Sequence, residues 1–272
     1  MQPIGVFDSG VGGLSVLQAL RSELPHERFV YVSDAGHAPY GERDVAHVLQ
    51  RSLAICDHLV RRQGVRALVV ACNTATAAAI VALRDAYPTL PIVGVEPALK
   101  PAAARSRTGM VGVLATRGTL ASEKFQALLR AQNSKVHFLL QACDGLAAAI
   151  EHDDVAQIHA LCARYTSNLG RFGATPGAID TVVLGCTHYA FATTELQKRV
   201  GPDVALLDAG QPVAQRTHYL LGDENPPNSA TSSGERNQIW VNLWTTGAVN
   251  TLQDAAHRWL TDCGPVHHVA LA

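Results

Sequence analysis

Short apolar runs of strand type alternate along this chain with longer segments whose apolar residues recur at helical spacing. The predicted strands are residues 4–7, 29–33, 67–71, 92–95, 110–114, 136–140, 181–184 and 239–243. The predicted helices are residues 10–24, 44–62, 76–87, 122–132, a segment beginning at 145, 155–172 and 250–260. In the second of these helices the apolar residues are three or four positions apart, which is typical of a packed helix face. Cys56 falls on that face and is interpreted as a buried small hydrophobe.

This alternation predicts an α/β protein with parallel sheets that carry helices on both faces. A turn flanked by Pro97 and Pro101 is interpreted as the first domain junction. The last predicted strand and helix are expected to return to the first domain. The predicted domains are residues 1–97 plus 211–272, which form a discontinuous unit, and residues 98–210.

Two cysteines follow predicted strands in nearly duplicate surroundings. Cys72 ends one β-branched apolar run and Cys186 ends another, and hydrogen-bonding side chains come next in both places. Ligand sites in open α/β sheets gather just beyond the carboxyl ends of parallel strands. The two thiols therefore suggest one acid/base group from each half of a doubled fold. A second correspondence supports the doubling, because residues 5–9 and residues 112–116 both form a strand that runs into a polar turn.

Composition indicates a globular chain with a small-molecule partner. Of its 272 residues, 47% are hydrophobic and 17% are charged, and the formal net charge is −1. No global field therefore draws the protein to nucleic acid or to an acidic membrane. Without a signal sequence or an apolar segment long enough to cross a bilayer, we expect a cytoplasmic protein with reduced cysteines. The cysteine spacing matches no metal-binding pattern, so we expect no metal.

The pair of thiols fits a reaction that exchanges a proton at one carbon. Racemisation removes a proton from one face and returns a proton to the other, so each face needs its own acid/base group. The ordinary pKa of a free thiol, about 8.5, is close enough to neutrality for this task. A pyridoxal enzyme would need a Schiff-base lysine, and no lysine here stands in a comparable setting, so we expect no cofactor. The alternative is that Cys72 and Cys186 are buried structural thiols.

Asp8 and His188 are the candidate orienting groups. Each lies at a strand end, where it is expected to hydrogen-bond the thiol of its own domain and to shift that thiol's pKa differently. Alternatively, Asp8 is an N-cap for the helix predicted from Gly10, and His188 is an ordinary strand-end side chain. The candidate donors to a charged amino-acid substrate are Ser9, Asn73, Thr74, Thr116, Thr119 and Thr187.

Six sequence blocks occur along the chain in a fixed order. They are residues 5–16 (GVFDSGVGGLSV), 38–41 (APYG), 70–76 (VACNTAT), 93–98 (VGVEPA), 112–116 (GVLAT) and 184–189 (LGCTHY). Together they resemble the bacterial glutamate racemases of the aspartate/glutamate racemase family, and the resemblance covers nearly the whole chain. It implies two pseudosymmetric parallel-sheet sandwich domains with the active site in the cleft between them.

The resemblance also implies a reaction, namely interconversion of L- and D-glutamate without a cofactor, which supplies D-glutamate for peptidoglycan. It assigns deprotonation of D-glutamate to Cys72 and of L-glutamate to Cys186, with help from Asp8 and His188. The substrate contacts it implies are Asp8, Ser9, Tyr40, Gly41, Asn73, Thr74, Thr187 and His188, with Thr116 and Glu151 as further candidates to line the pocket.

Two other interpretations stay open at this stage. One is a racemase for aspartate or another amino acid, and the other is a catalytically idle regulatory binding protein. The expected partner is glutamate, with neither nucleic acid nor membrane, and a homodimer is compatible with the sequence. The polar stretch of residues 222–236 is expected to be an exposed loop remote from the cleft.

Overall fold

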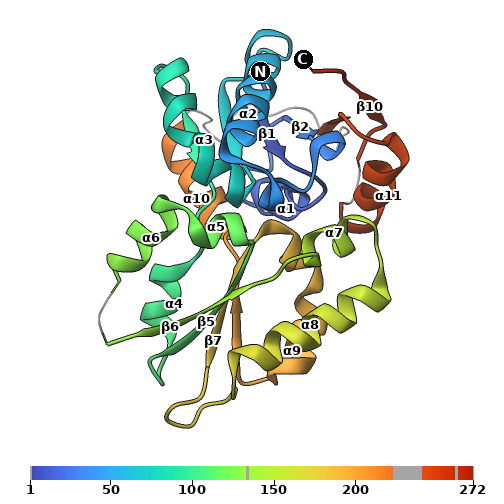
Figure 1. The fold of residues 1–272 in the computed structure, drawn as a ribbon. Helices are drawn as coiled ribbons and strands as arrows, with labels where there is room; N and C mark the ends of the chain where they lie inside the picture. Colours follow the sequence, from blue (N-terminus) through green and yellow to red (C-terminus); the bar gives the residue numbers. More distant parts are fainter. Residues whose placement is uncertain (1, 133–134, 223–240, 261–262, 272) are drawn as a thin grey trace, which may run out of the picture.

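The computed structural model describes residues 2–132, 135–222, 241–260 and 263–271. Within these residues two parallel sheets form, with strand orders β10-β9-β2-β1-β3-β4 and β6-β5-β7-β8 (Figure 1). The first sheet contains β1 (Ile4–Asp8), β2 (Phe29–Ser33), β3 (Ala67–Val70), β4 (Ile92–Gly94), β9 (Val241–Thr245) and β10 (Val266–His268). The second contains β5 (Met110–Ala115), β6 (His137–Ala142), β7 (Thr181–Gly185) and β8 (Ala205–Leu207).

Helices follow most of the strands. They are α1 (Leu14–Glu23), α2 (Val45–Arg61), α3 (Asn73–Ala86), α4 (Leu99–Arg105), α5 (Arg117–Ala121), α6 (Glu123–Arg130), α7 (Leu146–Glu151), α8 (Val155–Leu169), α9 (Thr193–Val200), α10 (Gly210–Leu221) and α11 (Val249–Trp259). Three short 3₁₀ turns, η1 (Ala35–His37), η2 (Tyr40–Glu42) and η3 (Thr187–Ala192), also follow strands.

The central strands of each sheet are buried on both faces. In β1 the side chains of Ile4 and Val6 join the apolar cluster that contains α1, whereas Phe7 joins the cluster that contains α2 and α3. In the second sheet Val183 packs with α4 and α6, and its neighbour Leu184 packs with α7 and α8. Alternate side chains of a strand point to opposite faces, so apolar residues at consecutive positions require cover on both sides.

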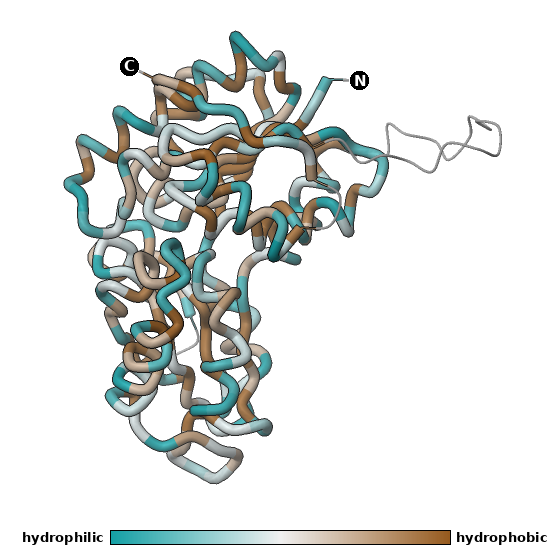
Figure 2. Tube along the Cα trace, turned by 90° about the vertical axis from the view of Figure 1, so that its right-hand side faces the viewer, coloured by the Kyte–Doolittle hydropathy of each residue, from teal (hydrophilic) through white to brown (hydrophobic). Residues whose placement is uncertain are grey.

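The two sheets share a topology. The order β2-β1-β3-β4 in the first sheet corresponds to β6-β5-β7-β8 in the second, and every strand pairing is parallel. The fold is therefore α/β with two pseudosymmetric domains, which lie one above the other in Figures 1 and 2. Because β9 pairs with β2, the late part of the chain returns to the first sheet, as expected. The domain boundaries at 97/98 and 210/211 stay a prediction.

Several predicted elements need correction. Helix α1 begins at Leu14 rather than at Gly10, and its N-cap is Gly13, so Asp8 is not the cap of this helix. Helix α3 begins at Asn73, three residues earlier than expected, because the Cys72 side chain accepts the Ala75 N–H and caps it.

From Leu99 onward, the segment interpreted as a junction turn belongs to α4. Pro101 stands in the first turn of this helix. A proline is tolerated there because the first N–H groups of a helix have no partner within it. The sequence interpretation also missed α5, α9, α10, β8 and β10. The exposed loop predicted at 222–236 lies outside the described residues beyond Gly222.

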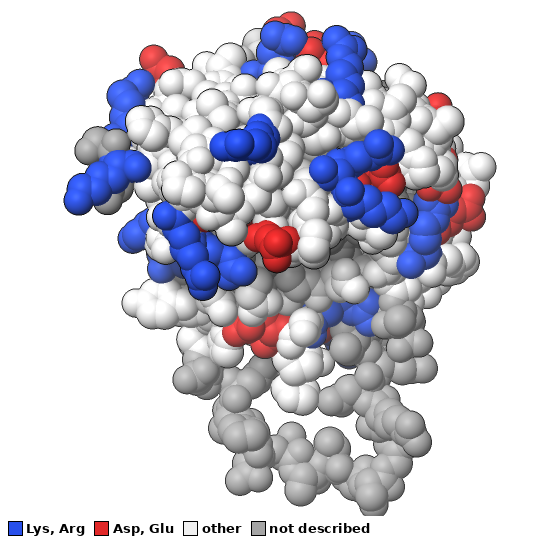
Figure 3. All heavy atoms as spheres, turned by 90° about the horizontal axis from the view of Figure 1, so that it is seen from below, with Lys and Arg blue, Asp and Glu red and all other residues white. Residues whose placement is uncertain are grey.

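The surface charge is mixed. On the face seen from below in Figure 3, basic and acidic side chains stand close to one another and most of the surface carries no charge. Among the helices that the structure describes, none combines the length and the apolar character needed to cross a membrane.

Candidate active site

The carboxyl ends of the strands in the two sheets face one cavity of about 240 Å³. This arrangement follows from the fold, since the strands of each parallel sheet all end at the same edge. Each residue for which the resemblance implied a role lines this cavity: Asp8, Ser9, Tyr40, Gly41, Cys72, Asn73, Thr74, Thr116, Glu151, Cys186, Thr187 and His188. Thr119 is buried behind Thr116, to which its hydroxyl is hydrogen-bonded.

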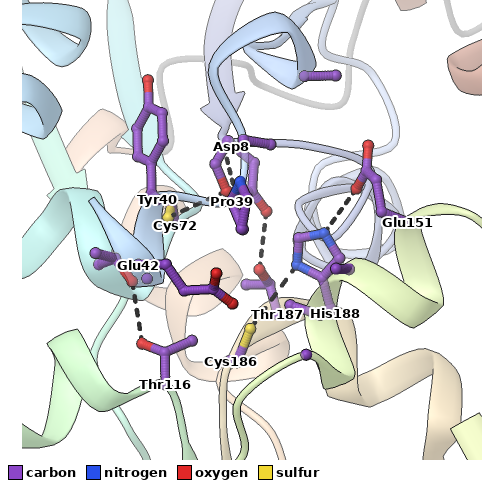
Figure 4. A pocket seen from close by; sticks show the side chains of 18 of the residues that line it. Asp8, Pro39, Tyr40, Glu42, Cys72, Thr116, Glu151, Cys186, Thr187 and His188 are labelled. Carbon is purple, nitrogen blue, oxygen red and sulfur yellow. Dashed lines mark hydrogen bonds and ion pairs between the residues drawn. The ribbon is translucent and has the colours of Figure 1, made fainter. Parts of the chain in front are cut away.

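The two thiols enter the cavity from different domains (Figure 4). Cys72 follows β3 of the first sheet, and Cys186 follows β7 of the second. Their exposed fractions are only 6% and 8%. Both are free thiols, so each can carry or accept a proton.

Cys72 stands at the start of α3 in an environment that favours the protonated thiol. Burial raises its pKa, and the negative charge of Asp8 raises it further. The Ala75 N–H, 3.4 Å from the sulfur, opposes this shift but does not cancel it. The Cys72 Sγ lies 3.7 Å from the Ser9 hydroxyl.

Cys186 has a histidine beside it. The Nδ1 atom of His188 lies 3.8 Å from Cys186 Sγ, and Nε2 lies 2.8 Å from the Glu151 side chain. Burial alone would lower the pKa of His188, but the hydrogen bonds to Cys186 and Glu151 outweigh burial and raise the pKa well above its ordinary value. A protonated imidazole therefore stands between Glu151 and the Cys186 sulfur.

Asp8 forms no hydrogen bond with Cys72, the thiol of its own domain, which corrects the expectation from the sequence. Its carboxyl accepts hydrogen bonds from the Ser9 N–H and hydroxyl, and from Thr187 Oγ1 at 2.8 Å. Thr187 belongs to the second domain, so the last bond crosses the cleft. Burial raises the pKa of Asp8, although the nearby His188 charge and these hydrogen bonds lower it in part. Asp8 acts on Cys72 through its charge and through Ser9.

The glycines of the 10–13 turn allow the two domains to approach closely. A Cβ atom on Gly12 would lie 2.2 Å from His188 Nδ1, and one on Gly10 would lie 2.2 Å from Glu151 Oε2. The Val11 N–H, between them, donates a 2.8 Å hydrogen bond to Glu151. Cys186, His188 and Glu151 are joined by hydrogen bonds, and the 10–13 turn packs against His188 and Glu151. Side chains at positions 10 and 12 would not fit there, so glycine is required at both.

Neutral donors dominate the inner part of the cavity. The buried Asn73 Nδ2 has no hydrogen-bond partner in the structure, and the Thr74 and Thr116 hydroxyls bond one another across the cleft at 3.2 Å. Arg117 is the sole Lys or Arg among the described lining residues, and it is paired with Asp144 in the lining. A substrate carboxylate held deep in the cavity would therefore be bound by hydroxyl, amide and backbone N–H groups.

Sequence reasoning missed some residues of the lining. Cys143 follows β6, which makes it a third thiol at a strand end, and it is buried against the same cavity. Burial raises the pKa of Cys143, so it is protonated. The sequence feature that could have identified Cys143 as a lining residue is its position shortly after the predicted strand 136–140. Glu42, Arg117 and Asp144 line the cavity as well, and their sequence surroundings carry no comparable signal.

Within the described part of the chain, no group of three His, Cys, Asp or Glu residues is placed to hold a metal ion.

Comparison with known proteins points to one family. Residues 5–217 match the family model for Asp/Glu/Hydantoin racemase. The glutamate racemase of Ectopseudomonas mendocina (strain ymp) is 45% identical over 268 residues, which cover 97% of each protein. The crystal structure of Escherichia coli glutamate racemase with L-glutamate and the activator UDP-MurNAc-ala has a TM-score of 0.82 at 30% identity, and covers 100% of both chains. That of the Francisella tularensis enzyme with D-glutamate has a TM-score of 0.79 at 26% identity, over 99% of this chain and 97% of that one.

Proposed function

This chain belongs to the Asp/Glu/hydantoin racemase family, and we propose that it interconverts L- and D-glutamate by removing the α-proton with the thiolate of one cysteine, Cys72 or Cys186, and returning a proton from the thiol of the other. The choice of glutamate rests on the extent of similarity to proteins named glutamate racemase. The observation that carries the mechanism is that two buried thiols from two pseudosymmetric domains line one cavity. Each thiol is then available to one face of the substrate's α-carbon.

The reaction from L-glutamate begins with the Cys186 thiolate. It takes the α-proton from one face, and the electron pair of the broken C–H bond is delocalised into the α-carboxylate. The Cys72 thiol then gives its proton to the opposite face, which forms D-glutamate and leaves Cys72 as the thiolate. From D-glutamate the same steps run in reverse, so Cys72 is the base and Cys186 the acid. No proton is gained or lost over the cycle once the thiols re-equilibrate.

The neighbours of the two thiols suit these starting states. The His188 imidazolium, 3.8 Å from Cys186, stabilises a thiolate there, and Glu151 keeps the imidazole in place. Cys72 is kept protonated by burial and by Asp8. The two thiols thus have electrostatically different neighbours, which is the asymmetry that an acid/base pair needs.

Substrate binding is proposed to use the neutral donors of the cavity. Asn73, Thr74 and the N-terminus of α3 receive one carboxylate from the Cys72 side, and Thr187 is placed on the Cys186 side. The unpartnered Asn73 Nδ2 is the clearest of these donors. The substrate ammonium group is expected near the carboxyl groups of Asp8 and Glu151.

We also propose that the reaction takes place in the cytoplasm without a cofactor, and that its D-glutamate enters peptidoglycan. The resemblance of the ordered sequence blocks supports this role.

Circular dichroism of purified protein with L-glutamate tests the proposed function. With the protein desalted and no cofactor added, the signal should decay to zero as the racemic mixture forms. L-Aspartate under the same conditions should keep its signal. Decay with aspartate alone would favour the aspartate racemase, and binding of glutamate without decay would favour an idle binding protein.

A further inference from the structure

A buried carboxylate near the cavity forms hydrogen bonds with several segments of the first domain. Asp34 follows β2 and is fully buried. Its carboxylate accepts hydrogen bonds from Thr246 Oγ1 at 2.7 Å and from the Tyr40 hydroxyl at 2.5 Å, and its Oδ1 lies 3.2 Å from His37 Nδ1. The proposed reaction gives this carboxylate no step.

Arg51 of α2 is the charged partner of Asp34. It donates in a bidentate manner, from Nε to Oδ2 at 3.0 Å and from Nη2 to Oδ1 at 3.1 Å. The Arg51 residue is 5% exposed, and its Nη1 donates a 3.0 Å hydrogen bond to the Leu271 carbonyl near the end of the chain. One guanidinium thus joins α2, the turn after β2 and the C-terminal segment.

Tyr40 connects this ion pair to the cavity. Its ring is 1% exposed, packs in the same apolar cluster as Cys72 and lines the cavity. Tyr40 lies close enough to Cys72 for a charge on one to affect the other, and the two are drawn on the same side of the pocket in Figure 4. Burial and the Asp34 carboxylate both raise the pKa of Tyr40, so its hydroxyl keeps its proton and donates to Asp34.

We propose that Arg51 is a positioning residue for the racemisation: it fixes Asp34, and through Asp34 it holds Tyr40 against Cys72. This inference rests on the proposed function, in which Cys72 serves one face of the substrate.

The geometry supports this role better than a contribution to stability alone. A buried ion pair is weak evidence for stability, because taking both charges out of water offsets their attraction. A planar guanidinium, however, fixes direction, since its N–H groups match the two oxygens of a carboxylate. Here one of those oxygens also receives the Tyr40 hydroxyl, so the direction of the carboxylate sets the position of the Tyr40 ring.

A double-mutant cycle on Arg51 and Tyr40 tests the inference. Arg51→Lys keeps the buried positive charge, so the protein should fold, but it loses the bidentate geometry. We expect Arg51→Lys and Tyr40→Phe each to lower kcat/KM for glutamate about tenfold, a loss typical of an active site displaced by a fraction of an ångström. The kcat/KM of the double variant should be no more than about twofold below that of the less active single variant, because both changes release the same Tyr40 ring.

Arg66→Lys is the matched control. Arg66 forms a 2.7 Å ion pair with Glu27 in the same domain, but both residues precede strands and so lie at the sheet edge opposite the cavity. This variant should keep the wild-type kcat/KM. If losses from Arg51→Lys and Tyr40→Phe multiply in the double variant, Arg51 does not act through Tyr40 and the inference is wrong.

A second readout does not depend on turnover. Alkylation of Cys72 by iodoacetamide, followed by peptide mass spectrometry, should become several-fold faster in Arg51→Lys, while alkylation of Cys186 should not change. An unchanged Cys72 rate in a folded variant would contradict the inference. If the wild type itself fails to racemise glutamate, the proposed function is wrong, and the alkylation rates still decide the role of Arg51.

Discussion

Cys72 and Cys186 are alike in sequence setting and differ in their neighbours. A negative charge and a helix N-terminus act on Cys72, whereas an imidazolium stands beside Cys186. Acid/base pairs need this kind of asymmetry, because one member must hold a proton while the other lacks one. We infer that Asp8 and His188 create this asymmetry, since one adds a negative charge near Cys72 and the other a positive charge beside Cys186.

The charge of Asp8 can be tested through the pH dependence of a single deprotonation. Asp8→Asn removes a negative charge that raises the pKa of Cys72. In the proposed mechanism, a D-glutamate analogue with chlorine at Cβ loses chloride after the Cys72 thiolate takes its α-proton. The rate of this elimination should rise with pH in the wild type, and should rise at lower pH in Asp8→Asn. The shift for the L-analogue should be smaller, because Asp8 reaches Cys186 only through Thr187 and His188, and an equal shift for both analogues would contradict the assignment.

The raised pKa of His188 links folding to pH. A histidine that binds its proton more tightly in the folded state contributes stability that is fully present below its ordinary pKa of about 6.5. That contribution falls as the pH rises towards the higher folded-state value. Between pH 6.5 and 8.5 the free energy of unfolding should therefore fall more steeply in the wild type than in His188→Gln. Urea unfolding at several pH values measures both slopes, and parallel slopes would show that the hydrogen bonds to Cys186 and Glu151 do not raise this pKa.

At the scale of elements, the buried strands could be predicted because their apolar runs are continuous. The strands at the centre of both sheets, such as β1 and β7, are covered on both faces and carry a strong signal. Strands β8 and β10 have three residues each, too few for any period to be read, and they are less buried than the equally short β4, which was predicted. Helix α10 has a proline in its first turn. A proline there is tolerated, but in a sequence whose helix start is unknown it suggests that no helix forms.

The site could be predicted as far as it follows from strand ends. Cys72, Thr116, Cys186 and the Asp8–Ser9 pair each stand at or just beyond the carboxyl end of a strand, so the fold brings them together. The partners of these residues could not be predicted, because they come from tertiary packing across the cleft. The hydrogen bonds from Thr187 to Asp8 and between Glu151 and His188 join residues far apart in sequence.

The 10–13 turn is an element whose glycines are required by close approach. Gly12→Ala places a methyl group 2.2 Å from His188 Nδ1, so the imidazole must leave its present position 3.8 Å from Cys186 Sγ. A displacement of this size should lower kcat/KM about a hundredfold. Gly64→Ala is the control, since nothing lies within 4 Å of its Cβ, although its φ of +63° is unfavourable for alanine. The control should lose about 1 kcal/mol of stability and keep its turnover. Wild-type turnover in Gly12→Ala would contradict the packing described.

At the scale of the whole molecule, contacts on several sides of the cleft join the two domains. Thr74 meets Thr116 on one side, while the Phe191 and Trp259 rings stack at 3.7 Å on another. Trp259, on α11, packs against apolar clusters of both domains. The relative placement of the two thiols therefore depends on residues that touch neither of them.

Trp259→Ala should weaken the association of the domains. It removes the stacked pair and part of the shared apolar contact, so the free energy of unfolding should fall by about 2 kcal/mol in urea. Val249→Ala, at the exposed start of the same helix, should change it by less than about 0.5 kcal/mol. Equal effects of the two substitutions would show that the Phe191–Trp259 contact adds nothing to the interface.

The central claim is that each thiol serves one face of the substrate. Racemisation kinetics cannot show this, because the enantiomers have equal free energy, and kcat/KM must then be equal in both directions. Elimination of chloride from the separate enantiomers of a Cβ-chlorinated glutamate is free of that constraint, since it needs only one deprotonation. Serine keeps hydrogen bonding, but its hydroxyl is far too weak an acid to replace a thiol near neutral pH.

The most direct measurement is therefore elimination by Cys72→Ser and Cys186→Ser with each enantiomer, after both variants are shown to be folded and to have lost racemase activity. Cys72→Ser should eliminate chloride from the L-analogue and not from the D-analogue. Cys186→Ser should show the opposite preference. Elimination from both enantiomers by either variant, or a substrate trapped as a thioester on one cysteine, would contradict the two-thiol mechanism.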